Sequence, residues 1–301
     1  MIYKPRTESI ELQVLEYLQL RMDISDKDLQ YSLNLKKGLE GEMAFDALID
    51  NISCECIILN DLLLKQNNNL FQIDSLIIIS DTIYLFEIKN FDGDYYYDSE
   101  RLYKKPQTEI NDPLVQLNRT DSLFRQLLQS FGFHFKINPF IVFINPEFTL
   151  YQAPLNKPFI FPTQLHNLFK KLNTIPSAIN NKHKRLAEKL EMLHIKDSPY
   201  KQLPAYNYNQ LQKGITCKKC YSFFISVEGK RCICKECGYE EFIASAVMRN
   251  VKEFQLLFPE QRITTNTVHE WCKLVESKRT IRRVLEKNFH KKGVRQWTYY
   301  E

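Results

Sequence analysis

Two hydrophobic patterns alternate along the first 175 residues of the chain. Apolar residues at helical spacing predict helices over about 7–35, 38–50 and 113–130, with a polar break in the first helix at 26–28. Short β-branched and apolar runs bounded by Asn, Asp or Pro predict strands over 56–59, 70–79, 83–89 and 140–144. Strands interleaved with helices in this order indicate an α/β domain in which a mixed sheet is flanked by helices.

The pattern changes after residue 175, where the strand-like runs end. Apolar residues return at helical spacing in three groups near the C-terminus, namely Val247, Val251, Phe254 and Phe258, then Val268, Trp271 and Val275, then Ile281, Val284, Leu285 and Phe289. We therefore divide the chain into an N-terminal helical segment, an α/β domain, a helical arm with a linker, a cysteine-rich segment and an α-helical C-terminal domain. Their bounds are 1–35, 36–175, 176–213, 214–242 and 243–301.

Composition excludes several classes of protein. Only eight of the 301 residues are glycine, and none forms GxGxxG or GxxxxGK, so dinucleotide and P-loop phosphate sites are ruled out. The net charge of +5 is unevenly distributed. Residues 210–301 hold eighteen Lys and Arg against ten Asp and Glu, a balance of +8, whereas the other 209 hold twenty-three against twenty-six, a balance of −3. A basic C-terminal part suits either a solvated surface or contact with phosphates.

The sequence contains no segment expected to enter a membrane. Its longest apolar runs, such as 140–144, are far shorter than the roughly 20 residues that span a bilayer, and the N-terminus is charged. We therefore expect a cytoplasmic protein without membrane contacts. In that compartment the eight cysteines should be reduced thiols or metal ligands.

The strands at 70–79 and 83–89 carry charged residues in an otherwise apolar setting. If Ser80 and Asp81 form the turn of an antiparallel hairpin, Asp74 lies opposite Glu87, and the two-residue period places Lys89 on the same face as Glu87. A three-residue turn would shift this register by one. Facing carboxylates repel each other, and a divalent cation with oxygen ligands would stabilise them. The alternative is an ordinary ion pair on an exposed face.

Two further polar residues are expected near this hairpin. Glu42 lies one and two turns before the apolar residues Phe45 and Ile49, so its carboxylate should point inward. Glu40 is the alternative to Glu42 as the glutamate of this helix. Gln116 follows Asp112 and Pro113 in the first turn of the helix at 113–130, where its side chain could reach the same cleft.

This order of motifs resembles the nuclease-related domain family (NERD), a branch of the PD-(D/E)XK restriction-endonuclease-like fold. The resemblance spans roughly residues 37–172. It is carried by Gly38-x-x-Gly41-Glu42, by Gln72-Ile73-Asp74 on one strand, by Glu87-Ile88-Lys89 on the next, and by Gln116 on the following helix. Ile73 stands where the wider fold commonly has proline.

The resemblance implies a Mg²⁺-dependent nuclease. Asp74 and Glu87 would bind Mg²⁺, Glu42 would support the ion or its water, Lys89 would polarise the attacking water or the scissile phosphate, and Gln116 would orient the nucleophile or Lys89. The expected substrate is a nucleic acid, with DNA favoured over RNA. The wider fold also includes domains that bind nucleic acid without cutting it. A non-catalytic DNA-binding or regulatory protein is therefore the alternative function.

The cysteine-rich segment contains two C-x-x-C pairs, Cys217 with Cys220 and Cys234 with Cys237. Each pair can present two thiolates to one tetrahedral Zn²⁺, and Gly238 eases the tight backbone after the second pair. This spacing resembles a zinc ribbon, which is a structural site, and a redox dithiol is the competing interpretation. Cys232 could replace Cys234 as a ligand, but the spacing favours Cys234.

The last predicted helix presents a basic surface. Its apolar residues share one side, so Arg282, Arg283 and Lys287 should face outward together with the nearby Lys278 and Arg279. This arrangement is compatible with a helix-turn-helix-like unit that places a basic helix on DNA. A helical bundle with a solvated basic face is the alternative.

Overall fold

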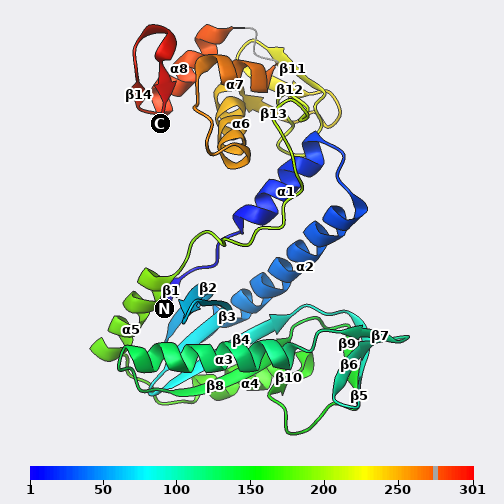
Figure 1. Ribbon diagram of the computed structural model, residues 1–301, viewed down its shortest axis with the longest axis vertical. Helices are drawn as coiled ribbons and strands as arrows, with labels where there is room; N and C mark the ends of the chain where they lie inside the picture. Colours follow the sequence, from blue (N-terminus) through cyan, green and yellow to red (C-terminus); the bar gives the residue numbers. More distant parts are fainter. Residues whose placement is uncertain (274–276) are drawn as a thin grey trace. The chain divides into compact units, whose positions relative to one another are not determined.

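A computed structural model describes residues 1–273 and 277–301 of the chain. The chain divides into two compact units, and each unit combines two stretches of sequence. Unit 1 comprises Met1–Glu8 and Leu33–Tyr200, and unit 2 comprises Ser9–Ser32 and Lys201–Glu301. Figure 1 labels the helices and strands of both units.

Unit 1 is built on a six-stranded sheet. Its strands are β1 (Ile2–Lys4), β2 (Ile57–Gln66), β3 (Asn69–Ile79), β4 (Thr82–Lys89), β8 (Lys136–Phe143) and β10 (Phe159–Ile160). They lie in the order β1-β2-β3-β4-β8-β10. The pairs β2–β3 and β3–β4 are antiparallel and the remaining pairs are parallel, so the sheet is mixed, as predicted.

Helices cover both faces of this sheet (Figure 1). On one face, α3 (Pro113–Ser130) and α5 (Asn181–Leu193) pack on Leu76 and Ile78. On the other face, the unit 1 part of α2 (Asp26–Ile49) and α4 (Leu165–Asn173) pack on Ile77 and Ile79. Successive residues of β3 are therefore buried on opposite faces, which explains its continuous apolar run. The predicted α/β fold with a helix-flanked mixed sheet is confirmed.

The β3–β4 hairpin has the predicted register. Ser75 pairs with Phe86 and Ile79 pairs with Thr82 across a turn in which Ser80 has a φ of 50°. The ladder between β2 and β3 is less regular. Asn60 pairs with Ser75 and Leu62 pairs with Ile73, but the intervening Asp61 and Asp74 do not pair, and Asp61 has a φ of 53°. Asp74 therefore lies at an interruption of the sheet.

The start of α2 corrects one prediction. The polar residues at 26–28, expected to break a helix, instead begin α2, which continues to Ile49 without the separate start expected near residue 38. Ser25 Oγ accepts a hydrogen bond from the backbone N–H of Asp28, and Asp26 and Asp28 lie in the first turn. Acidic residues there interact favourably with the helix dipole, so a polar run marks the beginning of this helix.

Unit 1 also contains a four-stranded sheet that the sequence pattern did not predict. Its strands are β5 (Gly93–Asp98), β6 (Arg101–Lys104), β7 (Thr108–Ile110) and β9 (Phe148–Tyr151), in the order β7-β6-β5-β9. Tyr95 and Tyr97 on β5 are buried in the same apolar cluster as α3. Strand β1 was missed as well, because a strand of three residues carries no periodic signal.

Unit 2 combines helices with a three-stranded ribbon. Its helices are α1 (Ile10–Arg21), α6 (Ile243–Leu257), α7 (Thr265–Cys272) and α8 (Lys278–Asn288), and its strands are β11 (Ile225–Glu228), β12 (Arg231–Cys234), β13 (Glu240–Phe242), β14 (Lys291–Lys292) and β15 (Tyr299–Tyr300). Two 3-10 turns, Pro162–Gln164 in unit 1 and Arg295–Trp297 in unit 2, complete the assignment. None of the helices in the described residues is both long and apolar enough to cross a membrane.

A buried ion pair lies at the centre of unit 2. Arg21 Nε lies 2.5 Å from Glu253 Oε1 and its Nη2 lies 2.9 Å from Glu253 Oε2, with both side chains almost fully buried. The guanidinium also stacks over Trp271 at 4.1 Å and donates to the carbonyls of Gln212 and Gly214. Trp271 is buried as predicted, whereas Val275, predicted for the same helix, lies outside the described residues.

Candidate functional site

Strand β4 carries two of the predicted site residues. Glu87 is 2% exposed, and its Oε1 lies 2.6 Å from Lys89 Nζ, so both side chains share one face as predicted. The Lys89 ammonium is a charge-assisted partner of this oxygen, and it opposes the rise that burial causes in the pKa of Glu87. A carboxylate offers about four acceptor sites, so a buried carboxylate beside an ammonium can still bind a cation.

Asp74 lies beside this pair on β3. Its Oδ2 accepts a 2.7 Å hydrogen bond from the backbone N–H of Ile88, the residue between Glu87 and Lys89. The interruption of the β2–β3 ladder leaves the Asp74 carbonyl free of strand pairing, and the side chain is buried. The hairpin therefore brings two buried carboxylates and one ammonium together, as its register predicts.

Helix α2 brings Glu42 to the same region because it approaches β4 closely at Gly41. A Cβ on Gly41 would lie 2.5 Å from Cβ of Asn90, so a larger residue would push the helix away. Asn90 Nδ2 also donates to the carbonyl of Lys37 at 2.8 Å. Glu42 points inward as predicted, with a side chain 20% exposed, whereas Glu40 is exposed.

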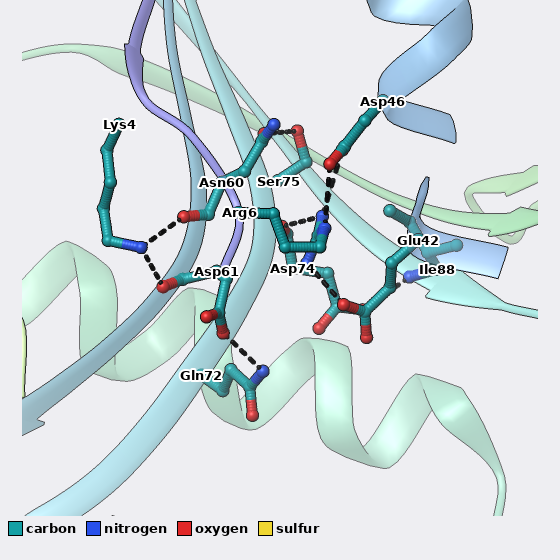
Figure 2. Close-up of polar contacts among 10 residues, drawn as sticks. All are labelled: Lys4, Arg6, Glu42, Asp46, Asn60, Asp61, Gln72, Asp74, Ser75 and Ile88. Atoms are coloured by element: carbon teal, nitrogen blue, oxygen red, sulfur yellow. Dashed lines mark hydrogen bonds and ion pairs between the residues drawn. The ribbon is translucent and has the colours of Figure 1, made fainter. Parts of the chain in front are cut away.

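Arg6 was not anticipated from the sequence. Its guanidinium contacts Glu42 Oε2, donates from Nε to Asp46 Oδ2 at 2.9 Å, and donates from Nη2 to the Asp74 carbonyl at 2.7 Å (Figure 2). Nearby, Lys4 Nζ donates to the carbonyls of Asn60 and Asp61 at 2.8 Å each. Two basic residues from the first eight thus satisfy backbone carbonyls where the β2–β3 ladder is interrupted.

Gln116 reaches Lys89 from α3. Its Oε1 accepts a 3.0 Å hydrogen bond from Lys89 Nζ, and the side chain is otherwise exposed. Asp112 caps this helix by accepting from the N–H of Leu114 at 2.8 Å, and the same oxygen accepts from Tyr97 Oη at 2.8 Å. The unpredicted four-stranded sheet therefore fixes the end of α3 from which Gln116 projects.

The carboxylates are crowded enough to resist ionisation. Burial, followed by repulsion from Asp74, raises the pKa of both Glu87 and Glu42 to about 8, although Lys89 and Arg6 respectively oppose these shifts. Burial also raises the pKa of Asp74. Burial alone would lower the pKa of Lys89, but the carboxylates of Glu87 and Asp74 raise it, so its ammonium stays charged. These opposing shifts are typical of functional sites.

The donor set fits a hard divalent cation. Asp74 and Glu87 offer carboxylate oxygens, which Mg²⁺ prefers, and both side chains are buried. The carboxylates are less tightly gathered than the cysteines. Among the described residues, only the four cysteines bring three or more ligand atoms within 4.8 Å of one another.

Those four cysteines are Cys217, Cys220, Cys234 and Cys237. The sulfur atoms of Cys217 and Cys237 lie 3.6 Å apart, and those of Cys220 and Cys234 lie 3.5 Å apart, so the two C-x-x-C pairs interleave. Cys232 is buried outside this cluster, and burial raises the pKa of its thiol to about 11. The cluster could hold a metal such as zinc.

The two C-x-x-C turns have the same backbone geometry. Tyr221 follows the first pair with a φ of 60° and donates its N–H to the Cys217 carbonyl at 3.0 Å. Gly238 follows the second pair with a φ of 70° and donates to the Cys234 carbonyl at 3.0 Å. Backbone N–H groups of Cys237 and Glu236 help to lower the pKa of the Cys234 thiol to about 7, which favours the thiolate that a metal needs.

The predicted basic residues of α8 face solvent. Ile281, Val284 and Leu285 are buried. The exposed side chains are Lys278, Arg279, Arg282, Arg283 and Lys287. Arg282 pairs with Glu286 at 2.9 Å and Lys278 Nζ donates to Asn266, so part of the surface is already engaged. The connection from α7 to α8 includes 274–276, which lie outside the described residues.

Comparison with known proteins identifies the domain that holds the carboxylates. Residues 37–144 match the family model of the nuclease-related domain (NERD). This part of the chain, 108 of the 301 residues, is therefore similar to the nuclease-related domain. The match begins where the sequence resemblance begins and ends at residue 144 instead of near 172. It contains Glu42, Asp74, Glu87, Lys89 and Gln116, but not Arg6 or the four clustered cysteines.

The other comparisons give little further information. No curated protein matches the chain. Among solved structures, the chain is similar to protein VC1899 from Vibrio cholerae, with 12% sequence identity and a TM-score of 0.25. That similarity covers 61% of this chain and 52% of VC1899, so it spans about half the length of that protein.

Proposed function

We propose that the nuclease-related domain is a Mg²⁺-dependent phosphodiesterase that hydrolyses nucleic acid, with DNA as the expected substrate. The observation that carries this proposal is the buried pair Asp74 and Glu87 beside the Lys89 ammonium. Such a group is expensive to bury for structure alone, since hydrophobic residues would pack there at lower cost. The family match supports a nuclease-like role for the same residues.

In this proposal each side chain has a defined role. Asp74 and Glu87 hold the ion, which would act as a Lewis acid on the phosphate and on the attacking water. Lys89 places its ammonium beside the reacting phosphate and stabilises the charge that develops there, while Gln116 orients that ammonium through the 3.0 Å hydrogen bond. Water adds to phosphorus, the bond to the leaving oxygen breaks, and that oxygen takes up a proton.

The basic surface of unit 2 suits the same substrate. In this proposal the side chains of α8 bind phosphates, and the cysteine cluster binds structural Zn²⁺ that keeps the ribbon folded. Arg279, Arg283 and Lys287 have no ion pair within the described residues, so their charges are available for phosphates. These contacts would bind nucleic acid irrespective of sequence.

The proposal is tested by incubating the zinc-loaded chain with labelled DNA and RNA in Mg²⁺. We expect fragments from the wild type and almost none from Lys89→Ala. Lys65→Ala, which removes an exposed lysine of β2, is the matched control and should cleave normally. Equal cleavage by both variants would remove Lys89 from the mechanism.

A non-catalytic DNA-binding protein would give a different set of results. It would show no cleavage, and its binding would weaken with salt, survive Glu87→Ala and Lys89→Ala, and fall when Arg282 and Arg283 are neutralised. The exposed basic residues of α8 are the observation that favours this second function.

A further inference from the structure

Arg6 occupies a position rich in oxygen ligands. Its guanidinium contacts one carboxylate oxygen of Glu42, both carboxylate oxygens of Asp46 at 2.9 and 3.1 Å, and the Asp74 carbonyl at 2.7 Å. The Arg6 side chain is 5% exposed, so these contacts are shielded from water. Carboxylate and carbonyl oxygens are also the ligands that hard divalent cations prefer.

We propose that Arg6 limits the carboxylate site to one divalent cation by occupying the place that a second cation would need. The inference rests on the metal-dependent function proposed above. Two-metal sites place their ions about 3.5–4 Å apart and share carboxylates between them. Here Asp74 would contribute a carboxylate to the first ion, but its carbonyl and the nearby carboxylates of Glu42 and Asp46 already bind a fixed protein cation (Figure 2).

The charges around the site agree with this number of ions. When a bound cation keeps all four carboxylates ionised, Glu42, Asp46, Asp74 and Glu87 supply four negative charges, and Arg6 and Lys89 supply two positive charges, which leaves a formal charge of −2. Asp61 and Lys4 lie next to this group, and their opposite charges cancel each other. One divalent cation therefore neutralises the site, whereas a second ion would leave it positive and buried, at a high cost in free energy.

The way in which Arg6 is held distinguishes it from a mobile counter-ion. Its Nε and Nη2 form a bidentate contact with Asp46, and Nη2 also donates to the backbone of β3. A guanidinium has five N–H donors in a rigid plane, so this geometry holds both the side chain and the carboxylate of Glu42. Arg6 is therefore a positioning residue, and residues outside the matched domain complete the site.

The test is to count Mn²⁺ ions bound by the full chain after its cysteine cluster has been loaded with zinc. Electron paramagnetic resonance measures free Mn²⁺ directly, without a substrate. We expect one ion per wild-type chain, none in Glu87→Gln, one in Arg6→Lys, and two in Arg6→Gln. Arg125→Gln is the matched control, because Arg125 also binds a carboxylate, that of Asp121, and a backbone carbonyl, that of Ile137. It should bind one ion.

Four outcomes would count against this inference in different ways. Two ions in the wild type, or one ion in a folded Arg6→Gln variant, would overturn the role of Arg6 and leave the metal-dependent function intact. No ion in the wild type would overturn the metal-dependent function and this inference together. If Arg6→Gln does not fold, the number of anomalous Mn²⁺ peaks in wild-type crystals decides the question, and a peak among Glu42, Asp46 and the Asp74 carbonyl would contradict the proposal.

Discussion

The cysteine cluster could hold a metal ion and the carboxylate site is proposed to hold one, but the chain assembles the two sites differently. The four cysteines come from two local turns, and the backbone of each turn brings its own pair of thiols together. The carboxylate site draws Glu42, Asp74 and Glu87 from a helix and two strands, while Arg6 arrives from the N-terminal segment. Local turns gather ligands tightly, whereas a site spread over several elements depends on the packing of the whole domain.

The two sites also differ in their electrostatics. In the cysteine cluster the shifts are divided: backbone N–H groups help to lower the pKa of Cys234 to about 7, whereas hydrogen bonds to the other thiols help to raise the pKa of Cys220. In the carboxylate site, burial raises the pKa values of Glu42 and Glu87 to about 8, so a cation must compete with protons. The first arrangement suits a structural ion and the second suits an ion that takes part in chemistry.

The largest expected effect comes from removing the structural metal. Cys217→Ala should lose zinc and unfold the ribbon, because structural Zn²⁺ contributes on the order of 10 kcal/mol to the folding of small domains. Cys232→Ala is the matched control, since Cys232 is buried on β12 outside the cluster. Zinc content by mass spectrometry should be one ion per chain in the control. Loss of zinc from Cys232→Ala alone would contradict the assigned ligands.

The next prediction concerns the free energy of unfolding, which should fall as pH rises when Mg²⁺ is absent. Glu42 and Glu87 have a raised pKa of about 8 in the folded chain, so between about pH 4.5 and 8 the folded state binds protons that the unfolded state has released. The free energy of unfolding should therefore decrease across this window, by at most about 1.4 kcal/mol per unit of pKa shift. Denaturant unfolding followed by circular dichroism measures it. Glu87→Gln should flatten the dependence, and an unchanged slope would show that Glu87 is not the titrating group.

A smaller effect is expected at Glu42, which supports the site from α2. Glu42→Gln should lower the cleavage rate by about 10- to 100-fold, the usual cost of losing a residue that orients metal ligands. Glu40→Gln, two residues earlier on the exposed side of the same helix, should leave the rate unchanged. Equal rates for the two variants would limit the site to Asp74, Glu87 and Lys89.

The smallest effect concerns α8. Neutralising Arg282 and Arg283 should weaken nucleic-acid binding. It should also make binding less sensitive to salt: the slope of the logarithm of the association constant against the logarithm of salt concentration should shrink by about 0.9 for each phosphate contact that is lost. Neutralising Lys65 and Lys136, two exposed lysines of unit 1, provides a control with the same change in charge. If the salt dependence of binding does not change in the Arg282 and Arg283 variant, the basic face of α8 is a solvated surface that does not contact nucleic acid.

The sequence predicted the parts of the molecule that depend on local periodicity. The register between β3 and β4 follows from a short turn and alternating strands, and the cysteine cluster follows from the spacing of the two pairs. Arg6 was not predictable in this way, because it meets Glu42 across 36 positions of sequence and its neighbouring strand β1 has three residues. The sequence held no signal for Arg6, which is one of twenty-three Lys and Arg among residues 1–209.

The central claim is tested most directly by the rate of phosphodiester cleavage in matched samples of wild type and Glu87→Gln with equal zinc content. We expect the wild type to cleave DNA in Mg²⁺, to stop when Mg²⁺ is omitted, and to resume when Mg²⁺ is restored, whereas Glu87→Gln in Mg²⁺ should be slower than the wild type by at least about 100-fold. Cleavage at the same rate by both proteins, or cleavage independent of Mg²⁺, would contradict a catalytic metal site at Asp74 and Glu87.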